Sequence, residues 1–587
     1  MIREKVTRHA QEKTFKSHDG IELFYRYWPA PKPKGAIVLF HRGHEHSGRL
    51  QHIVDELQLP DFDFFAWDAR GHGRSPGERG DSPSVYASVR DVDCFIKTLS
   101  CEYSIAEENI FVIAQSVGAV LVSTWVHDYA PRIRGIVLAS PAFSVKLYVP
   151  FARKLLALRQ KIQGRFFVNS YVKAKFLTHD PQRIASYNAD PLVSRPIASH
   201  ILLSLFETAK RVVDDADAIV VPTQIVISGA DFVVHQRPQH DFFVRLGSSD
   251  KERHLLTGFY HDTLGEKDRI LALNIIRKFI IKLYECPYKI TDLTQSDKKS
   301  FTRTEADQLA TPLSIFSARG AYWGLVRFSL QVGALFSKGI KLGRQTGFDS
   351  GSTLDYVYQN RAQGLTSFGV WLDKLYLNSI GWRGIRQRKI HIEELIQVAI
   401  GQLREKGRRV DIMDIAAGHG RYILEAIEAN HKSKPDSIIL RDYSDINVEK
   451  GRQLAKDKGL DDITQFVKAD AFSLESYPGG DNAMTLGVVS GLYELFADND
   501  LIRTSLQGLA ATIEAGGYLI YTGQPWHPQL EMIARALTSH RQGQAWVMRR
   551  RSQAEIDQLV AAAGFTKIDQ RIDEHGIFTV SIAEKNT

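Results

Sequence analysis

Cysteine is scarce in this chain, and long apolar runs are missing. Three cysteines, Cys94, Cys101 and Cys286, occur in 587 residues, and their spacing fits no metal-ligand pair. So few thiols exclude a disulfide framework and indicate a reducing compartment. No uncharged apolar stretch reaches the ~18 residues that a membrane-spanning helix needs. The charged start, Met1–Lys5, precedes no apolar core, so no signal peptide is indicated and we expect a cytoplasmic protein.

The bulk composition is that of a soluble globular protein. Apolar residues make up 44% of the chain and charged residues 24%. A chain of 587 residues is too long for one hydrophobic core, so we expect at least two domains. The net charge of +8 favours an anionic partner, although such an excess on a long chain often serves solubility alone.

One serine organises the first half. In Phe-Val-Ile-Ala-Gln-Ser-Val-Gly-Ala-Val, residues 111–120, an apolar run leads to Ser116 and a helical pattern follows it. This pattern is typical of a strand-to-helix turn that holds a serine in a tight corner. The turn presses residues two before and two after the serine against neighbouring backbone, so they must be small, as Ala114 and Gly118 are. The pattern alone does not establish a catalytic serine.

Strands and helices alternate around this turn. We expect strands over residues 20–28, 35–40 and 62–67, and a helix over about 84–100 before the serine strand. This alternation predicts a mostly parallel sheet covered on both faces, which is an α/β fold.

Three histidines, His41, His44 and His46, follow the second of these strands. A metal site is one interpretation, but the spacing lacks the helical i, i+4 form and no distant ligand pair completes it. The sequence favours a loop whose backbone N–H groups face a developing oxyanion.

A serine nucleophile needs a base and a carboxylate that orients the base. One predicted strand ends in Asp231, and another is followed by the loop residue His261. The order Ser116, Asp231, His261 is that of the α/β-hydrolases. The weaker candidates are Asp215 and Asp217, which precede a strand, and His254, which lies inside one.

Together these segments resemble the monoacylglycerol lipase and lysophospholipase branch of the α/β-hydrolases, of serine aminopeptidase S33 type. The resemblance covers about residues 10–285, and the segments 45–49 and 71–75 are its most specific parts. Arg42 stands where that branch usually has a small residue.

The resemblance implies a set of site residues. Ser116 would be the nucleophile, His261 the base and Asp231 its orienting acid. The backbone N–H groups of Gly43 and Val117 would form the oxyanion hole.

Residues 142–220 are expected to form a helical cap inserted between strands. Eight Lys and Arg residues and no Asp or Glu occur between residues 142 and 179, interleaved with apolar side chains. The segment is either a solvated face over a substrate pocket or a basic amphipathic cap that rests on anionic lipid.

The second half contains a small-residue loop after a strand. The run Asp-Ile-Ala-Ala-Gly-His-Gly, residues 414–420, leads into a helix whose N-terminus is electropositive. Asp442 ends the next predicted strand, at about the 20-residue spacing from Gly420 that suits contact with a ribose. Asp470 ends a third strand.

This half, about residues 385–585, resembles the class I S-adenosylmethionine-dependent methyltransferases. The resemblance implies S-adenosylmethionine as cofactor, with Asp414, Gly418 and Gly420 around its methionine part. It places Asp442 on the ribose hydroxyls and Asp470 near the adenine. A nicotinamide dehydrogenase fits less well, because Asp470-Ala471-Phe472 and the terminal hairpin belong to the methyltransferase pattern. No Asn-Pro-Pro-Tyr motif follows strand four, so methylation of nucleic-acid bases is not indicated.

Between the two halves we expect a linker over 286–319 and a helical segment over 320–385 that caps a methyltransferase domain of residues 386–587. A helix over Ala321–Leu342 is predicted to carry one polar stripe, consisting of Arg327, Gln331, Ala334, Lys338 and Lys341. Such a helix is either buried between domains or lies in a membrane interface.

The whole chain resembles bacterial fusions of an α/β-hydrolase with a class I methyltransferase. We therefore expect two doubly wound domains, one with a helical cap and one Rossmann-like. The hydrolase would act on a lipid-like acyl ester, without metal or nucleic acid, and could lie peripherally on the inner membrane face. The alternative is a hydrolase of small non-lipid esters joined to a domain that only binds cofactor or serves as a scaffold.

Overall fold

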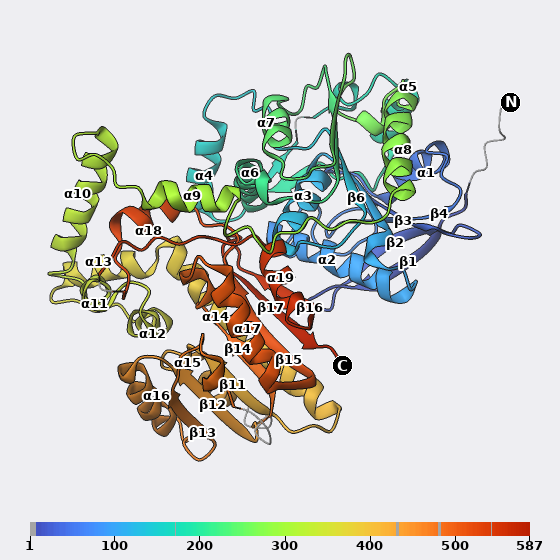
Figure 1. The fold of residues 1–587 in the computed structure, drawn as a ribbon. Coiled ribbons are helices and arrows are strands. Elements are labelled where there is room, and N and C mark those ends of the chain that lie inside the picture. Colours follow the sequence, from blue (N-terminus) through green and yellow to red (C-terminus); the bar gives the residue numbers. More distant parts are fainter. Residues whose placement is uncertain (1–7, 171, 430–433, 479–482, 542) are drawn as a thin grey trace. The chain divides into compact units, whose positions relative to one another are not determined.

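The computed structural model describes residues 8–170, 172–429, 434–478, 483–541 and 543–587, so the charged start of the chain lies outside the described residues. The chain divides into two compact units, residues 1–291 and 292–587. Each unit contains one large sheet flanked by helices (Figure 1). Within the described ranges, no helix combines the length and apolar character that crossing a membrane requires.

The first unit is built on an eight-stranded sheet in the order β1-β2-β4-β3-β5-β6-β9-β10. Its strands are β1 (Gln11–Lys16), β2 (Glu22–Trp28), β3 (Gly35–Phe40), β4 (Phe62–Trp67), β5 (Ile110–Gln115), β6 (Gly135–Ala139), β9 (Thr223–Ser228) and β10 (Lys251–Leu256). Only the pairs β1–β2 and β2–β4 are antiparallel. The predicted mostly parallel sheet is therefore confirmed.

Helices cover both faces of this sheet because its strands are apolar on both sides. Ile37 and Ile113 pack with α1 (Gln51–Glu56) and α8 (Ile270–Glu285) in one core cluster. The alternate residues Val38 and Val112 are equally buried. Three further helices pack against one another beside the sheet, namely α2 (Val85–Glu102), α3 (Val117–Tyr129) and α6 (Ser199–Asp214).

In its described residues, the segment over residues 142–220 contains three α-helices. It contains α4 (Ala152–Gln163), α5 (Pro181–Ala189), α6 and a short antiparallel pair, β7 (Phe167–Asn169) with β8 (Pro196–Ala198). After β9, α7 (Arg237–Arg245) precedes β10.

The second unit has a seven-stranded sheet in the order β13-β12-β11-β14-β15-β17-β16, in which β17 runs antiparallel to the other six strands. Its strands are β11 (Asp411–Ile415), β12 (Ser437–Asp442), β13 (Thr464–Lys468), β14 (Met484–Val489), β15 (Ile513–Gly523), β16 (Phe565–Ile572) and β17 (Thr579–Lys585). On one face lie α14 (Ile380–Glu405), α15 (Arg421–Glu428) and α16 (Asp445–Asp457); on the other lie α17 (Asn499–Thr512) and α19 (Gln553–Ala562). This doubly wound sheet, with its crossover between β11 and β14, is the predicted Rossmann-like fold.

Helices also fill the segment before α14. They are α9 (Phe301–Ala310), α10 (Ala318–Gly333), α11 (Lys338–Thr346), α12 (Gly351–Gln359) and α13 (Ser367–Leu377), with α18 (Leu530–Ala536) packed among them. The range assigned to a linker thus contains α9, where Glu305 pairs with Arg550 of the second unit.

The single helix predicted over Ala321–Leu342 is wrong, because the chain breaks between α10 and α11. Ser337 starts the second helix by accepting a hydrogen bond from the backbone N–H of Ile340 at 3.1 Å. The carboxylate of Asp373 fixes the break, since it accepts bonds from Ser337 Oγ at 2.5 Å and from the Gly339 N–H at 2.7 Å. The predicted polar stripe is therefore divided between two helices.

Candidate active sites

The Ser116 turn joins β5 to α3 with the backbone in a rare conformation. Ser116 has φ of 56° and ψ of −114°, a left-handed region that side chains seldom adopt. A Cβ added to Gly118 would lie 2.5 Å from the backbone oxygen of His41, so the position admits only glycine. Ala114 is fully buried beside Phe40 of β3. The two small residues thus permit the turn, as the sequence indicated.

Two hydrogen bonds connect Ser116, His261 and Asp231 in a line. His261 Nε2 lies 2.8 Å from Ser116 Oγ, and His261 Nδ1 lies 2.8 Å from Asp231 Oδ2. The second carboxylate oxygen of Asp231 accepts bonds from the backbone N–H groups of Val233 at 2.6 Å and Val234 at 2.9 Å. Because Asp231 is acceptor-only when ionised, His261 donates from Nδ1, and Nε2 is left to accept the serine proton.

The charge of Asp231 is stabilised in this position. Burial pushes the pKa of this carboxyl upward, but the charge and hydrogen bond of His261 and the two backbone N–H groups outweigh burial, so the pKa lies below its ordinary value. An ionised carboxylate at this place holds the imidazole in one tautomer and stabilises the imidazolium.

Gly43 lies next to Val117, the residue that follows the serine. A Cβ on Gly43 would lie 3.2 Å from Val117 Cγ2, so the two residues predicted to form the oxyanion hole are close neighbours. No hydrogen bond within the described residues engages the N–H of Gly43 or of Val117. Both donors are therefore free to bind a substrate oxygen.

Arg42 takes part in a buried network of charges that the sequence analysis did not identify. Its guanidinium donates to Glu45 at 2.7 Å and lies 3.9 Å from the carboxylate of Asp262. Asp262, the neighbour of His261, also accepts a bond from Arg183 of the cap helix α5 at 2.9 Å. These two arginines hold the pKa of Asp262 well below its ordinary value despite burial. The large residue after His41 thus ties the oxyanion loop to the histidine loop.

Two of the three histidines of this loop have separate side-chain partners. His41 accepts a bond from the N–H of Ala69 at 3.0 Å, and His46 contacts Asp190 of the cap at 3.0 Å. In the ranges that the structure describes, no group of three or more His, Cys, Asp or Glu side chains could hold a metal ion.

In the second unit, the small-residue loop leaves β11 through three positive φ angles. They are 58° at Ala416, 59° at Gly418 and 69° at Gly420. A Cβ on Gly420 would lie 2.5 Å from Leu440 Cδ1, so this glycine lets the loop pack closely on β12. The loop then enters α15, whose N-terminal N–H groups suit an anionic or polar ligand.

Asp442 organises this loop. Its carboxylate accepts bonds from the N–H groups of Gly418 and Ser444, both at 2.9 Å, and from Asn447 Nδ2 at 3.0 Å. A carboxylate offers about four lone-pair sites, so one remains for a ligand hydroxyl. Asp470 lies in the loop that follows β13, and its carboxylate accepts a hydrogen bond from the N–H of Phe472 at 2.9 Å. Among the described residues, no hydrogen bond or ion pair joins it to the other predicted cofactor residues.

Asp414 supplies the observation that favours a bound cofactor. Its side chain is fully buried, and neither carboxylate oxygen has a well-formed hydrogen bond, although the Tyr422 hydroxyl is near enough to act on it. Burial, followed by the charge of Asp442, raises the pKa of Asp414 well above its ordinary value. A buried carboxyl without a well-formed hydrogen bond is costly, so the site suits a ligand with a hydrogen-bond donor.

Helix α12, part of the helical segment before α14, covers this loop. Sequence patterns did not indicate which residues of that segment make the contact. A Cβ on Gly418 would lie 3.6 Å from Gly351 Cα at the start of α12. Arg421, the first residue of α15, donates to Asp355 of α12 at 2.6 Å.

A sequence family matches each of the two units. Residues 31–268 match the family "Serine aminopeptidase, S33", and residues 276–585 match the family "Putative methyltransferase". The second match spans more than half of the chain, so the chain belongs to that methyltransferase family, with an α/β-hydrolase of S33 type as its first unit.

One relative matches nearly the whole chain. The Uncharacterized protein YnbC of Escherichia coli is 55% identical over 578 residues, which are 97% of this chain and 98% of that protein. The Monoacylglycerol lipase of Mycolicibacterium smegmatis is 26% identical over 286 residues, 47% of this chain and 99% of that enzyme. The solved monoacylglycerol lipase of Paleococcus ferrophilus has 26% identity and a TM-score of 0.41, and covers 45% of this chain and 100% of that one.

Replacing Ser116 with alanine should abolish hydrolysis of p-nitrophenyl esters. The expected loss in turnover is on the order of a million-fold, because nucleophile and base act as a unit. Initial rates should be compared with those of Ser249→Ala, which removes an exposed hydroxyl of the same unit. Equal rates for Ser116→Ala and the unchanged chain would exclude Ser116 as nucleophile.

Replacing Asp442 with alanine should weaken S-adenosylmethionine binding by about 2 kcal/mol or more, because a charged acceptor of ribose hydroxyls is lost. Calorimetric titration measures this. The exposed Asp461→Ala is the matched control and should bind normally, and ester hydrolysis should be unaffected in both variants. Unchanged affinity in Asp442→Ala would contradict the assignment.

Proposed function

We propose that the first unit is a serine ester hydrolase in which Ser116 is the nucleophile. The hydrogen-bonded line from Ser116 through His261 to Asp231 is the observation that carries this proposal. Ser116 Oγ attacks the ester carbonyl while His261 Nε2 takes its proton, and the N–H groups of Gly43 and Val117 receive the oxyanion. His261 then returns the proton to the leaving alkoxide, and water releases the acyl group in the same way.

We further propose a lipid-like acyl ester, of the monoacylglycerol or lysophospholipid class, as substrate. Relatives of the first unit with the names monoacylglycerol lipase and monoglyceride lipase support this class. The cap helix α4 also supports it, because Phe151, Leu155, Leu158 and Ile162 recur at helical spacing and are all more than half exposed. Exposed apolar stripes of this kind mark contact with lipid or protein.

Two basic side chains lie along one side of that stripe. Lys154 and Lys161 are exposed on α4 and face no acidic partner in the described ion pairs. An apolar stripe with lysines along one side suits the interface of an anionic membrane, where the apolar residues enter the acyl region and the lysines meet head groups. We propose that the protein lies peripherally on such a membrane.

The second unit carries a separate exposed apolar face. Tyr322, Leu325 and Phe328 of α10 are 57%, 64% and 59% exposed. The other side of α10 contacts α18, where Arg319 pairs with Glu531 and Arg327 donates to the backbone of Arg535. This face is a second candidate for lipid contact.

For the second unit we propose S-adenosylmethionine-dependent methyl transfer. Asp414, Gly418 and Gly420 would surround the methionine part and Asp442 the ribose, with Asp470 toward the adenine. The buried carboxyl of Asp414, which has no well-formed hydrogen bond, and the remaining lone pair of Asp442 support this arrangement. The cofactor would supply an activated methyl group, and the protein would orient it and exclude water. A domain that binds cofactor without transferring methyl is the alternative, which measured turnover would separate from an enzyme.

Membrane association predicts that the protein sediments with phosphatidylglycerol liposomes at low salt. About 1 M salt should release most of it, because charge attraction is screened to ~3 Å. Lys154→Glu with Lys161→Glu, and separately Leu325→Glu with Phe328→Glu, should each reduce the sedimented fraction while hydrolysis of soluble esters persists.

Lys267→Glu with Lys278→Glu is the matched control, because it makes the same charge change at exposed positions outside α4. If the control variant loses binding as much as the α4 variant, net charge rather than α4 directs the association. A wild-type protein that stays in the supernatant at low salt would rule out the membrane proposal.

A further inference from the structure

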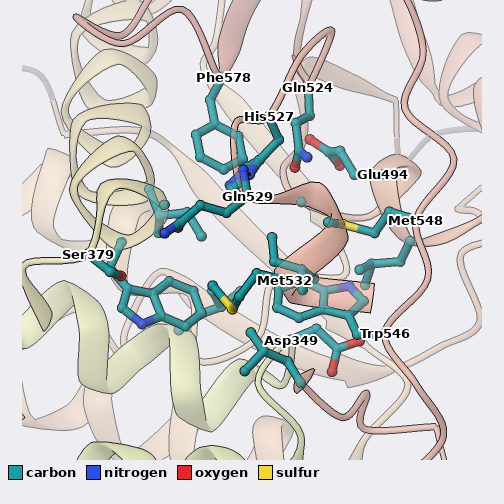
Figure 2. A pocket seen from close by; sticks show the side chains of 18 of the residues that line it. Asp349, Ser379, Glu494, Gln524, His527, Gln529, Met532, Trp546, Met548 and Phe578 are labelled. Carbon is teal, nitrogen blue, oxygen red and sulfur yellow. The ribbon is translucent and has the colours of Figure 1, made fainter. Parts of the chain in front are cut away.

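A mainly apolar cavity of about 140 Å³ lies in the second unit, between the helical segment and the loops that follow β14 and β15 (Figure 2). Trp382, Trp546, Phe578, Met532 and Met548 are among the side chains around it. Its volume is similar to that of an apolar cavity of about 150 Å³ that takes up benzene. Size and lining therefore suit a flat apolar group such as a single aromatic ring.

One end of the cavity is polar and incompletely bonded. Glu494 accepts a hydrogen bond from Thr522 Oγ1 at 2.9 Å through one carboxylate oxygen, while its other oxygen, Oε2, is buried with no partner among the described residues. Gln524 Nε2 is likewise buried without an acceptor there. Figure 2 shows the ends of both side chains on the same side of the cavity. A single hydroxyl satisfies both, because it donates through its hydrogen and accepts through its oxygen.

His527 and Arg388 do not compete with Glu494 as proton acceptors, and the carboxylate of Asp349 is engaged by Ser539 Oγ and the N–H of His540, both at 2.6 Å. His527 Nδ1 accepts a bond from the N–H of Gln529 at 3.0 Å, so the proton of the neutral ring is on Nε2. Burial lowers the pKa of His527 to about 3, so the ring stays neutral and can only donate from Nε2. Arg388 is a permanent cation whose Nη1 lies 4.0 Å from Glu494 Oε1, which balances the charge of that carboxylate.

The polar end lies next to the cofactor loop in the sheet. β14 pairs with β11, and Val489 is opposite Ile415. Gly491 and Glu494 therefore leave the sheet beside the loop of residues 416–420, at the edge where doubly wound folds bind ligands.

We propose that this cavity binds the methyl acceptor and that the acceptor is a small neutral hydroxyl compound of aromatic-ring size, of the phenol class. The inference rests on the proposed methyltransferase function. The acceptor's O–H bond breaks and its proton passes to Glu494 Oε2, while an O–CH₃ bond forms. The methyl group comes from the sulfonium of S-adenosylmethionine, and the electron pair of the broken S–C bond stays on sulfur.

The test measures the binding of three probes, phenol, toluene and benzoate, to the full chain. Binding is monitored by ligand-observed NMR in the presence of S-adenosylmethionine. Phenol should bind about tenfold more tightly than toluene, because it adds a hydrogen bond to a charged group. It should also bind more tightly than benzoate, whose charge Glu494 repels. Glu494→Gln should bring phenol and toluene within about threefold of each other, whereas Glu449→Gln, an exposed control on α16, should preserve the preference.

The wild-type comparison of the three probes stands even if a variant fails to fold. Equal binding of phenol and toluene, or a preference for benzoate, overturns the hydroxyl assignment. Binding of S-adenosylmethionine without binding of any probe overturns the inference and leaves the proposed methyl transfer intact. If S-adenosylmethionine itself does not bind, the proposed methyltransferase function fails, and the inference fails with it.

Discussion

Both units depend on one constraint: the chain must turn sharply where a parallel strand ends. In the first unit this places Ser116 at a φ of 56°, and in the second it gives Ala416, Gly418 and Gly420 positive φ angles. Such conformations cost about 1–3 kcal/mol at a non-glycine residue and persist only when the surroundings enforce them. As a result, a hydroxyl or a row of backbone N–H groups is presented at the edge where parallel sheets bind ligands. Buried strands on each side make the turns rigid.

Hydrogen-bonded carboxylates then hold each turn in register with its neighbours. In the first unit, Asp231 is hydrogen-bonded to His261. Asp262, the next residue along the chain from His261, is held by Arg42 and Arg183. In the second unit, Asp442 ties the glycine loop to the start of α16. Removing one member of such a buried network leaves other charges unpaired, so each network favours a single geometry over many similar ones.

Much of this arrangement was accessible from the sequence because it depends on local patterns. Apolar runs followed by Ser116, Asp231 or Asp442 mark strand ends, and parallel strands bring their ends to one edge. The roles of these residues remain predictions. The link from Arg183 to Asp262 was not accessible, since it joins helix α5 to a loop 79 residues away. Nor was the position of α12 over Gly418. The break at Ser337 did have a signal, a serine that can cap a helix, but the apolar pattern on both sides obscured it.

The central claim is that a single activated serine in the first unit performs the hydrolysis. Intact-mass analysis after reaction with an alkyl fluorophosphonate, followed by peptide mapping, tests it most directly. We expect one phosphonyl adduct per chain, located on Ser116, because among the described residues this hydroxyl alone is bonded to a histidine that Asp231 orients. An adduct on a different residue, or a folded protein that forms none, would contradict it.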